Sequence, residues 1–287
     1  MTNYSINKLI KNTVSLLERD GISHEEAVCE VYILLEHFAK ITKKDLILNP
    51  NMILNEDVYT EIQKAVKLRI EEKLPVQYIT GEAYFMGECF KVNKNVLIPR
   101  PETEILVNET IKTVNLFDTP FIVDIGTGSG CIAIMIAKLL SDINIFSIDI
   151  SEESLNMARE NASKLGVLNN LTFLNSDLLQ NIDKNIDIIV SNPPYIDIKE
   201  LKTMQSEVAL HEPHLALFAD ENGLFFYRNI IEQAVEKLNK NGFILFELGI
   251  DQSQSVKELF IKNNFTVMAI IPDFAGIDRV IIARKNK

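Results

Sequence analysis

A glycine-rich loop is the first stretch whose residue types and spacing suit a chemical task. Three glycines stand at alternate positions in the run Gly126-Thr127-Gly128-Ser129-Gly130, which lies between an apolar run and a helical pattern. Alternate glycines let the backbone turn sharply and let a ligand approach without meeting a Cβ atom. In an open α/β sheet such a loop lies outside the carboxyl end of a strand, where ligands bind. The loop therefore predicts a small-molecule site.

An acidic residue supports a nucleoside ligand for this loop. Asp149 ends the next apolar run, where a carboxylate can accept hydrogen bonds from both hydroxyls of a ribose. It could instead be a solvated strand end or cap the helix that begins near Glu152, and Asp124 is equally suited to orienting the loop and to contacting a ligand. A dinucleotide fingerprint would need its third glycine where Cys131 stands, and no GxxxxGK[ST] run occurs. S-adenosylmethionine is the nucleoside ligand that suits this pattern.

A second stretch, Asn192-Pro193-Pro194-Tyr195, follows another apolar run. Its two prolines restrict the backbone and keep Asn192 out of the helical region. The Asn192 side-chain oxygen and the Pro193 carbonyl are two acceptors that suit a planar NH₂ group with two hydrogens, and Tyr195 could lie flat against such a group. The stretch could simply end a strand with a capping asparagine. Beside the glycine-rich loop, a substrate site is the better interpretation.

These stretches need a scaffold, and the second part of the chain predicts one. Short β-branched or aromatic runs alternate with helical patterns, which indicates parallel βαβ units with helices on both faces of a sheet. The last two strands have a short connection and should form an antiparallel hairpin at one edge. Strands are expected at 121–125, 145–149, 171–175, 187–191, 243–248, 266–271 and 279–283, and helices at 131–140, 152–165, 224–238 and 253–261.

The first part of the chain has a different pattern. Residues 1–75 predict a small helical bundle, with a capping box formed by Ser23 and Glu26. Residues 76–100 predict a β-hairpin linker because glycines separate short extended runs. A helix-start signal at the end of the linker begins the third part, residues 101–287. The expected hairpin strands are 89–92 and 95–98.

The composition limits the class of protein. The 287 residues are 47% hydrophobic and 24% charged, and 29 basic against 40 acidic side chains give a formal charge of −11. This balance argues against a protein that mainly binds a phosphate backbone. Residues 1–75 hold 10 basic and 12 acidic side chains, so both parts are acidic. The apolar run 131–137 is too short to cross a bilayer, no signal peptide is recognisable, and the three cysteines lack zinc-like spacing. We expect a cytoplasmic enzyme without a metal site.

Taken together, these stretches resemble a known family. The run Asn192–Tyr195 with Gly126–Gly130 is similar to the amino-group methyltransferases. Three further stretches resemble the release factor glutamine methyltransferases of the HemK type, and the resemblance runs from about residue 5 to the C-terminus. They are QYITGE at 77–82, VLIPRPETE at 96–104 and EPHLAL at 212–217.

The resemblance implies both a fold and an activity. The fold is α/β: a Rossmann-like class I S-adenosylmethionine-dependent methyltransferase domain with a seven-stranded sheet, preceded by the helical bundle and the hairpin. The activity is methylation of the side-chain amide nitrogen of the glutamine in the Gly-Gly-Gln motif of class 1 peptide chain release factors. We also expect a monomer that binds neither nucleic acid nor a membrane.

The resemblance further assigns site residues. Asn192 and Pro193 would be catalytic, and Leu178 would pack against the adenine where some members of the family have an aromatic residue. The residues expected to hold the substrate glutamine are Asn192, Pro193, Pro194 and Tyr195. The residues expected to contact S-adenosylmethionine are Gly126, Thr127, Gly128, Ser129, Gly130, Asp149, Asp177, Leu178 and Asn192.

Other interpretations stay open. A DNA adenine or cytosine amino-methyltransferase uses a similar Asn/Asp-Pro-Pro-aromatic turn, although such enzymes usually carry a basic recognition region. A nicotinamide-dependent oxidoreductase conflicts with the position of the third glycine. A binding module without activity conflicts with the intact Asn192–Tyr195 turn. His211 and His214 have a spacing that metal ligands use, but a structural role is the better interpretation because no third ligand is evident.

Overall fold

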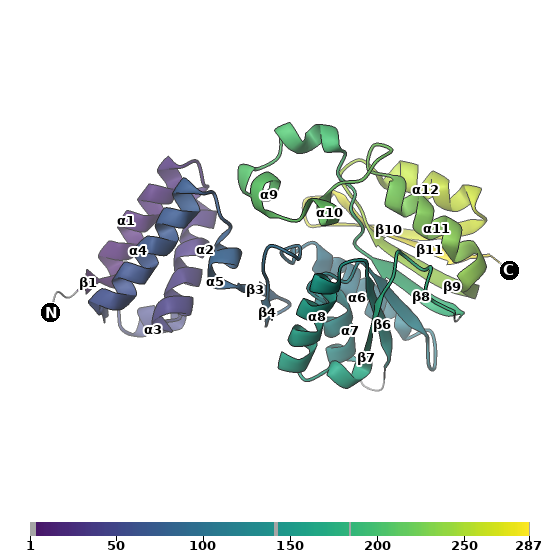
Figure 1. Cartoon of the computed structure of the whole chain (residues 1–287), viewed down its shortest axis with the longest axis horizontal. Helices are drawn as coiled ribbons and strands as arrows, with labels where there is room; N and C mark the ends of the chain where they lie inside the picture. The colour runs from purple at the N-terminus through teal and green to yellow at the C-terminus, as the bar shows by residue number, and fades with distance from the viewer. Residues whose placement is uncertain (1–3, 141–142, 184, 287) are drawn as a thin grey trace. The chain divides into compact units, whose positions relative to one another are not determined.

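The computed structural model describes residues 4–140, 143–183 and 185–286 (Figure 1). The chain divides into two compact units. Unit 1 consists of Met1–Gly81 together with Gln205–His211, and unit 2 consists of Glu82–Met204 together with Glu212–Lys287. A short segment from late in the chain therefore belongs to the N-terminal unit.

Unit 1 is a helical bundle with its own apolar core. Ser23 Oγ accepts a hydrogen bond from the Glu26 amide and caps a helix, whereas the capping box with both reciprocal bonds is formed by Thr42 and Asp45. Buried leucine, isoleucine and valine side chains, Leu17 and Ile62 among them, form the core. The helices are α1 (Ile6–Arg19), α2 (His24–Leu34), α3 (Lys43–Leu48), α4 (Glu56–Glu71), α5 (Val76–Thr80) and α9 (Ser206–His211), and β1 (Tyr4–Ser5) pairs with β2 (Ile53–Leu54).

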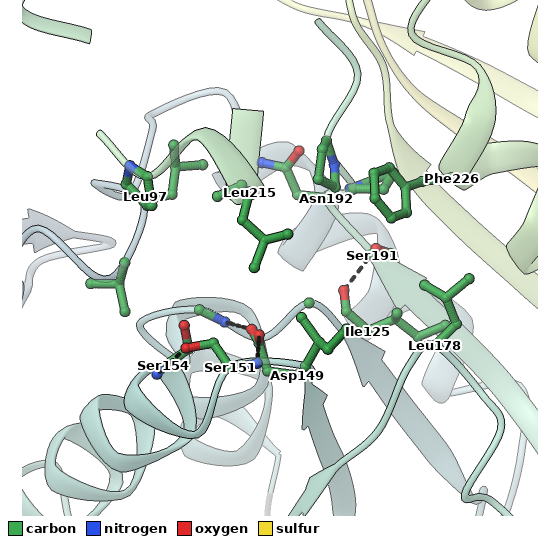
Figure 2. Close-up of a pocket in the computed structure, with 18 of the residues that line it drawn as sticks. Leu97, Ile125, Asp149, Ser151, Ser154, Leu178, Ser191, Asn192, Leu215 and Phe226 are labelled. Carbon is green, nitrogen blue, oxygen red and sulfur yellow. Dashed lines mark hydrogen bonds between the residues drawn. The ribbon is translucent and has the colours of Figure 1, made fainter. Parts of the chain in front are cut away.

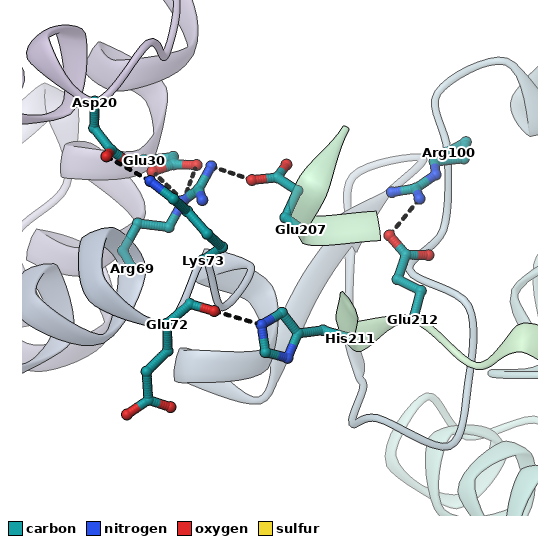
Figure 3. A network of polar contacts seen from close by, with 9 residues as sticks. All are labelled: Asp20, Glu30, Arg69, Glu72, Lys73, Arg100, Glu207, His211 and Glu212. Atoms are coloured by element: carbon teal, nitrogen blue, oxygen red, sulfur yellow. Dashed lines mark hydrogen bonds and ion pairs between the residues drawn. The ribbon is translucent and has the colours of Figure 1, made fainter. Parts of the chain in front are cut away.

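Helix α9 is attached to the bundle by buried charge. Arg69 of α4 is 3% exposed, and its Nε lies 2.9 Å from Glu30 Oε1, while its Nη2 pairs with Glu207 of α9 (Figure 3). His211 Nε2 donates to the Glu72 carbonyl oxygen at 2.6 Å. Because both contacts lie inside unit 1, residues 205–211 are part of its folded body.

The linker differs from the expected hairpin. Residues 76–80 form α5 within unit 1, because Pro75 starts this helix and Gly81 ends it in the left-handed conformation. The hairpin consists of β3 (Glu82–Phe85) and β4 (Glu88–Lys91). Met86 and Gly87 form the turn between them with φ of 49° and 79°, which suits a tight two-residue hairpin. Residues 95–98, expected as the second strand, are in no strand.

Unit 2 contains a seven-stranded sheet, which confirms the predicted α/β fold. The described strands lie in the order β10-β11-β9-β8-β5-β6-β7; the pairs from β9 to β7 are parallel, and β11 is antiparallel to both of its neighbours. The C-terminal hairpin thus lies at one edge, as expected. The strands are β5 (Ile122–Ile125), β6 (Ile145–Asp149), β7 (Leu171–Asn175), β8 (Ile186–Ser191), β9 (Leu238–Glu247), β10 (Phe265–Pro272) and β11 (Asp278–Lys285).

Helices cover both faces of this sheet. The core on one face includes side chains of α6, α7 and α8, and the core on the other includes side chains of α11 and α12 (Figure 1). Strand β5 pairs with both β6 and β8, so the strand order reverses there, and the loops after β5 and β8 leave from the same edge. The helices of unit 2 include α6 (Thr103–Val114), α7 (Cys131–Leu139), α8 (Glu152–Lys164), α10 (His214–Leu217), α11 (Phe225–Lys237) and α12 (Ser253–Lys262).

Among the described residues, none of the helices combines the length and the apolar character that crossing a bilayer requires.

Candidate functional site

The glycine-rich loop follows β5 and turns sharply, as predicted. Gly126, Gly128 and Gly130 have φ of 71°, 56° and 83°, a region in which a side chain is strained. The Gly126 and Thr127 amides both donate to the Ile148 carbonyl of β6, at 2.9 and 3.0 Å. These bonds fix the loop against the neighbouring strand.

The three glycines serve two purposes. A Cβ atom on Gly126 would meet no atom within 4 Å, and this residue lines a cavity. A Cβ atom on Gly130 would come within 2.8 Å of Ile134 Cδ1 and 3.0 Å of Ala158 Cβ. Gly130 therefore allows α7 and α8 to pack closely, whereas Gly126 keeps the cavity open.

Asp149 lies at the end of β6 and accepts hydrogen bonds from two loops. Its Oδ2 accepts from the Gly128 amide at 3.0 Å, and its Oδ1 accepts from the Ser151 amide at 2.9 Å. Burial raises the pKa of Asp149, and these amides oppose the shift. Each carboxylate oxygen has lone-pair capacity for a further donor. The carboxylate is thus oriented by the backbone and lines the cavity.

The Asn192–Tyr195 turn follows β8 and contacts two buried residues outside the predicted motifs. Asn192 Nδ2 donates to Thr103 Oγ1 at 3.4 Å, and Thr103 Oγ1 donates to Glu247 Oε2 at 2.6 Å. The Tyr195 hydroxyl donates to Glu247 Oε1 at 3.4 Å. Burial raises the pKa of Glu247 to about 7, while the Thr103 hydrogen bond opposes the shift. Both ends of the turn are therefore connected to one carboxyl group.

A cavity of about 390 Å³ in unit 2 brings the two predicted stretches together. Figure 2 shows Asp149 and Asn192 on opposite sides of it, with Leu215 between them. Leu178 lines the cavity with φ of 49°, and the Ser176 hydroxyl donates to its carbonyl at 2.8 Å. The cavity has the size and the largely apolar walls of a small-molecule site.

The structure places most, but not all, of the predicted site residues at this cavity. Those that line it are Gly126, Gly128, Asp149, Asp177, Leu178, Asn192, Pro193 and Pro194. Those that do not are Thr127, Ser129, Gly130 and Tyr195.

Three of the four residues away from the cavity, Thr127, Ser129 and Tyr195, make contacts elsewhere in unit 2. The hydroxyl of Thr127 donates to Asp124 Oδ2 at 2.6 Å, and the Ser129 carbonyl accepts from Asn161 Nδ2 at 2.9 Å. The Tyr195 side chain is partly buried against the apolar core, and burial raises the pKa of its hydroxyl. Asp124 is fully buried and does not line the cavity, so its role is the loop-orienting one.

Sequence reasoning missed several residues of the site. Leu97, Leu215 and Phe226 line the cavity and come from three separate segments. The buried pair Thr103 and Glu247 was missed as well. Glu247 does carry a signal, because a charged residue at the end of a long apolar run is placed at the carboxyl edge of the sheet.

The two histidines do not share a site. His211 belongs to unit 1, where it contacts the Glu72 carbonyl, while the His214 ring packs edge-on against Phe218 with a centroid separation of 5.1 Å in unit 2. Within the described part of the chain, no group of three or more potential ligands gathers in a metal-binding arrangement.

Comparison with protein families also separates an N-terminal part from a methyltransferase part, although the second match includes residues 205–211 of unit 1. Residues 8–81 match the family model of the PrmC N-terminal domain, and residues 102–226 match that of the methyltransferase small domain. The first match coincides with the N-terminal part of unit 1, and the second contains the glycine-rich loop, Asp149 and the Asn192–Tyr195 turn.

Two curated relatives match most of the chain. A protein of Fusobacterium nucleatum named release factor glutamine methyltransferase is 36% identical over 279 residues, which are 96% of this chain and 78% of the relative. A protein of the same name from Flavobacterium psychrophilum is 43% identical over 258 residues, 87% of this chain and 89% of the relative.

Solved structures agree on the fold. A methyltransferase from Pyrococcus furiosus has a TM-score of 0.52 at 18% identity and covers 81% of this chain and 100% of its own. A ribosomal protein L11 methylase from Lactobacillus delbrueckii has a TM-score of 0.50 at 21% identity, with coverage of 68% and 84%. These likenesses concern the fold alone.

Proposed function

We propose that this chain, which belongs to the family of release factor glutamine methyltransferases, methylates the glutamine side chain in the Gly-Gly-Gln motif of class 1 peptide chain release factors. S-adenosylmethionine is the proposed methyl donor. Membership of the family follows from the identities and coverage of the two relatives. Substrate and donor are the proposal, and the geometry of the cavity supports both.

The walls of the cavity fit an adenosyl group. Asp149 offers an oriented carboxylate to the ribose hydroxyls, and the open space at Gly126 leaves room for a ligand beside the backbone. Leu178 and Phe226 line the cavity and would supply apolar surface for a base. When bound, S-adenosylmethionine would supply a methyl group activated by its sulfonium.

One observation supports a primary amide as the group that receives the methyl. Among the described residues, neither Asn192 Oδ1 nor the Pro193 carbonyl oxygen has a hydrogen-bond partner, although both residues line the cavity. The Asn192 nitrogen, in contrast, donates to Thr103. Two free acceptors on a rigid turn suit a group with two N–H bonds, such as a primary amide.

The chemistry of a primary amide explains why such acceptors are needed. Its nitrogen lone pair is delocalised into the carbonyl, so the nitrogen is a weak nucleophile. Asn192 Oδ1 and the Pro193 carbonyl would accept its two hydrogens, hold the nitrogen in place and raise its electron density. Orientation of this kind supplies effective molarities on the order of 10⁵–10⁸ M. The amide proton becomes acidic as the methyl group is transferred, so no dedicated base is required at the start.

Mass spectrometry tests this proposal directly. Unmethylated release factor and duplex DNA are incubated separately with the protein and S-adenosylmethionine. We expect one added methyl group on the Gly-Gly-Gln peptide and no change in the DNA. Methylation of DNA alone would identify the protein as a nucleic-acid methyltransferase with the same site. A release factor whose motif glutamine is replaced by glutamate is the matched control substrate and should stay unmodified.

A further inference from the structure

Thr103 and Glu247 form a buried polar pair that the proposed chemistry does not use. Thr103 begins α6 and Glu247 ends β9, and each is 2% exposed. Burying a carboxyl group is costly unless donors satisfy it. No ion pair to Glu247 occurs among the described residues, so hydroxyl groups satisfy its side chain instead. Burial of the Glu247 carboxyl group therefore costs stability, and the pair lies against the Asn192–Tyr195 turn.

The hydrogen bonds between Glu247, Thr103 and Asn192 determine which atom of the Asn192 amide faces Thr103. The Thr103 hydroxyl has one hydrogen, and when Glu247 is ionised this hydrogen is used in the 2.6 Å bond to Glu247 Oε2. Thr103 Oγ1 can then only accept a hydrogen bond from its other side. The group that faces it must be a donor, and that group is Asn192 Nδ2 at 3.4 Å.

We propose that Thr103 and Glu247 are positioning residues that hold the Asn192 side-chain amide with its nitrogen toward Thr103 and its oxygen available to the substrate. This inference rests on the proposed function, because it explains how the acceptor for the glutamine amide is selected. The same carboxyl group also accepts from the Tyr195 hydroxyl. Glu247 thereby holds the two ends of the turn in a fixed relation.

The alternative orientation of Asn192 shows why positioning is needed. If the amide rotated by half a turn, its NH₂ group would meet the NH₂ group of the substrate, and two donors cannot form a hydrogen bond. With the hydroxyl of Thr103 removed, the amide would have no partner among the described residues that distinguishes its oxygen from its nitrogen. The substrate nitrogen would then lose one of its two acceptors for part of the time.

Helix α6 offers a matched control for the test. Thr110 lies two turns further along the same helix, is fully buried, and donates through Oγ1 to the Leu106 carbonyl at 2.7 Å. Replacing either threonine with valine removes one buried hydroxyl at nearly constant volume. Thr103→Val and Thr110→Val therefore differ chiefly in whether the lost hydroxyl faces Asn192.

The first experiment compares the kinetics of these variants on a Gly-Gly-Gln peptide. For Thr103→Val we expect kcat to fall by roughly 10–100-fold, the scale for removing a partner that orients a ligating side chain. The dissociation constant for S-adenosylhomocysteine should stay within about twofold of the wild type, since the loss affects only the acceptor. Thr110→Val should keep the wild-type kcat, and Thr103→Ser should restore most of the activity. Equal kcat values for the two valine variants would overturn the inference.

The second experiment keeps the inference testable if the wild-type protein fails to methylate the peptide. The side-chain NH₂ resonances of Asn192 are followed by NMR in the full chain. Thr103→Val should shift them and Thr110→Val should not. An unchanged Asn192 amide in Thr103→Val would refute the inference whatever the substrate is. Inactive wild-type protein with a shifted amide would instead refute the proposed function alone.

Discussion

Glu30 in unit 1 and Glu247 in unit 2 are both buried carboxyl groups, and they meet different kinds of partner. Glu30 is 6% exposed and lies against the guanidinium of Arg69, which also pairs with Glu207. Glu247 is 2% exposed and accepts from the hydroxyls of Thr103 and Tyr195. Burial raises the pKa of each group to about 7, although Arg69 opposes the shift at Glu30.

The comparison distinguishes two roles for a buried carboxyl group. Glu30 helps to join separate segments of the chain, whereas Glu247 helps to orient a neighbouring side chain. A guanidinium can hold two carboxylates at once, so Arg69 joins α2, α4 and α9 (Figure 3). A hydroxyl has one hydrogen to donate. Because Thr103 donates it to Glu247, Thr103 can only accept a hydrogen bond from the Asn192 side chain. We therefore expect changes near Glu30 to affect stability and changes near Glu247 to affect chemistry.

The largest expected effect is the loss of methyl transfer when Asn192 is replaced. Asn192→Ala should abolish methyl transfer, because the substrate amide loses the acceptor that the pair positions, while S-adenosylmethionine binding stays largely intact. Turnover and cofactor affinity, measured on the same preparation, check this. Asn263→Ala is the control, since that side chain only donates to the Leu259 carbonyl near the end of α12. Near-normal turnover of Asn192→Ala would remove Asn192 from its assigned role.

The next largest effect is expected in unit 1 and concerns the free energy of unfolding, not the methyl transfer. Arg69→Met should destabilise the bundle by about 3–5 kcal/mol, because it leaves the buried Glu30 carboxyl and the partly exposed Glu207 carboxylate without their cation. Hydrogen exchange of α2 and α4 peptides in the full chain measures this. Arg159→Met is the exposed counterpart, since Arg159 pairs with Glu152 on the surface of α8, and should cost less than about 1 kcal/mol. Similar protection in both variants would contradict the structural role of the Arg69 pair.

Asp149 differs from both Glu30 and Glu247, since its partners are backbone amides and it faces the cavity. Asp149→Ala should weaken S-adenosylmethionine binding by about 1.5–3 kcal/mol, the scale for hydrogen bonds to a charged group. Calorimetric titration measures it. Asp197→Ala is a suitable control because its carboxylate accepts the Lys199 amide away from the cavity. If both variants bind the ligand alike, Asp149 is not a ligand-binding residue.

The smallest effect concerns pH. Because the pKa of Glu247 rises from 4.5 to about 7 on folding, the folded state holds its proton more tightly than the unfolded state. The resulting stability is fully present below pH 4.5 and is lost as the pH rises through about 7, by about 3 kcal/mol in all. Roughly 1 kcal/mol of this falls between pH 6 and 8.

Glutamine variants separate the two buried carboxyls by this pH dependence. Glu247→Gln should show a shallower loss of unfolding free energy between pH 6 and 8 than the wild type, because glutamine does not titrate. Glu30→Gln should be less stable than the wild type at pH 8, since it removes an ionised partner from Arg69. Chemical denaturation at the two pH values measures both. Parallel pH profiles for Glu247→Gln and the wild type would contradict the raised pKa of Glu247.

Local patterns were sufficient to predict most of the fold. Strand β6 and helix α8 lie within a residue of their expected bounds, because the alternating βαβ pattern is a local signal. Strand β9 begins at Leu238 rather than residue 243, because Leu238 already pairs with Ile186 of β8; a register shift follows, and continuous pairing with β8 and β11 starts at Phe243. Tertiary pairing overrode local propensity there.

The candidate site was less accessible to sequence reasoning because its support comes from distant segments. Gly126, Asp149 and Asn192 were predicted, since each lies at or just after the end of a strand on the same sheet edge. Thr103 and Glu247 are 144 residues apart, and nothing local relates a helix-start threonine to a strand-end glutamate. Tyr195 was expected against the substrate, but its side chain is partly buried against the apolar core and its hydroxyl faces Glu247.

The membership of α9 in unit 1 has a consequence for how the protein is made. Helices α1, α2, α3 and α4 are synthesised well before Glu207, so of the two carboxylates only Glu30 is available to Arg69 until Glu207 has been added to the chain. The Glu207 carboxylate arrives only after the Asn192–Tyr195 turn has been synthesised. The bundle can therefore reach its complete set of ion pairs only when the turn has already left the ribosome, which links maturation of the first unit to translation of the second.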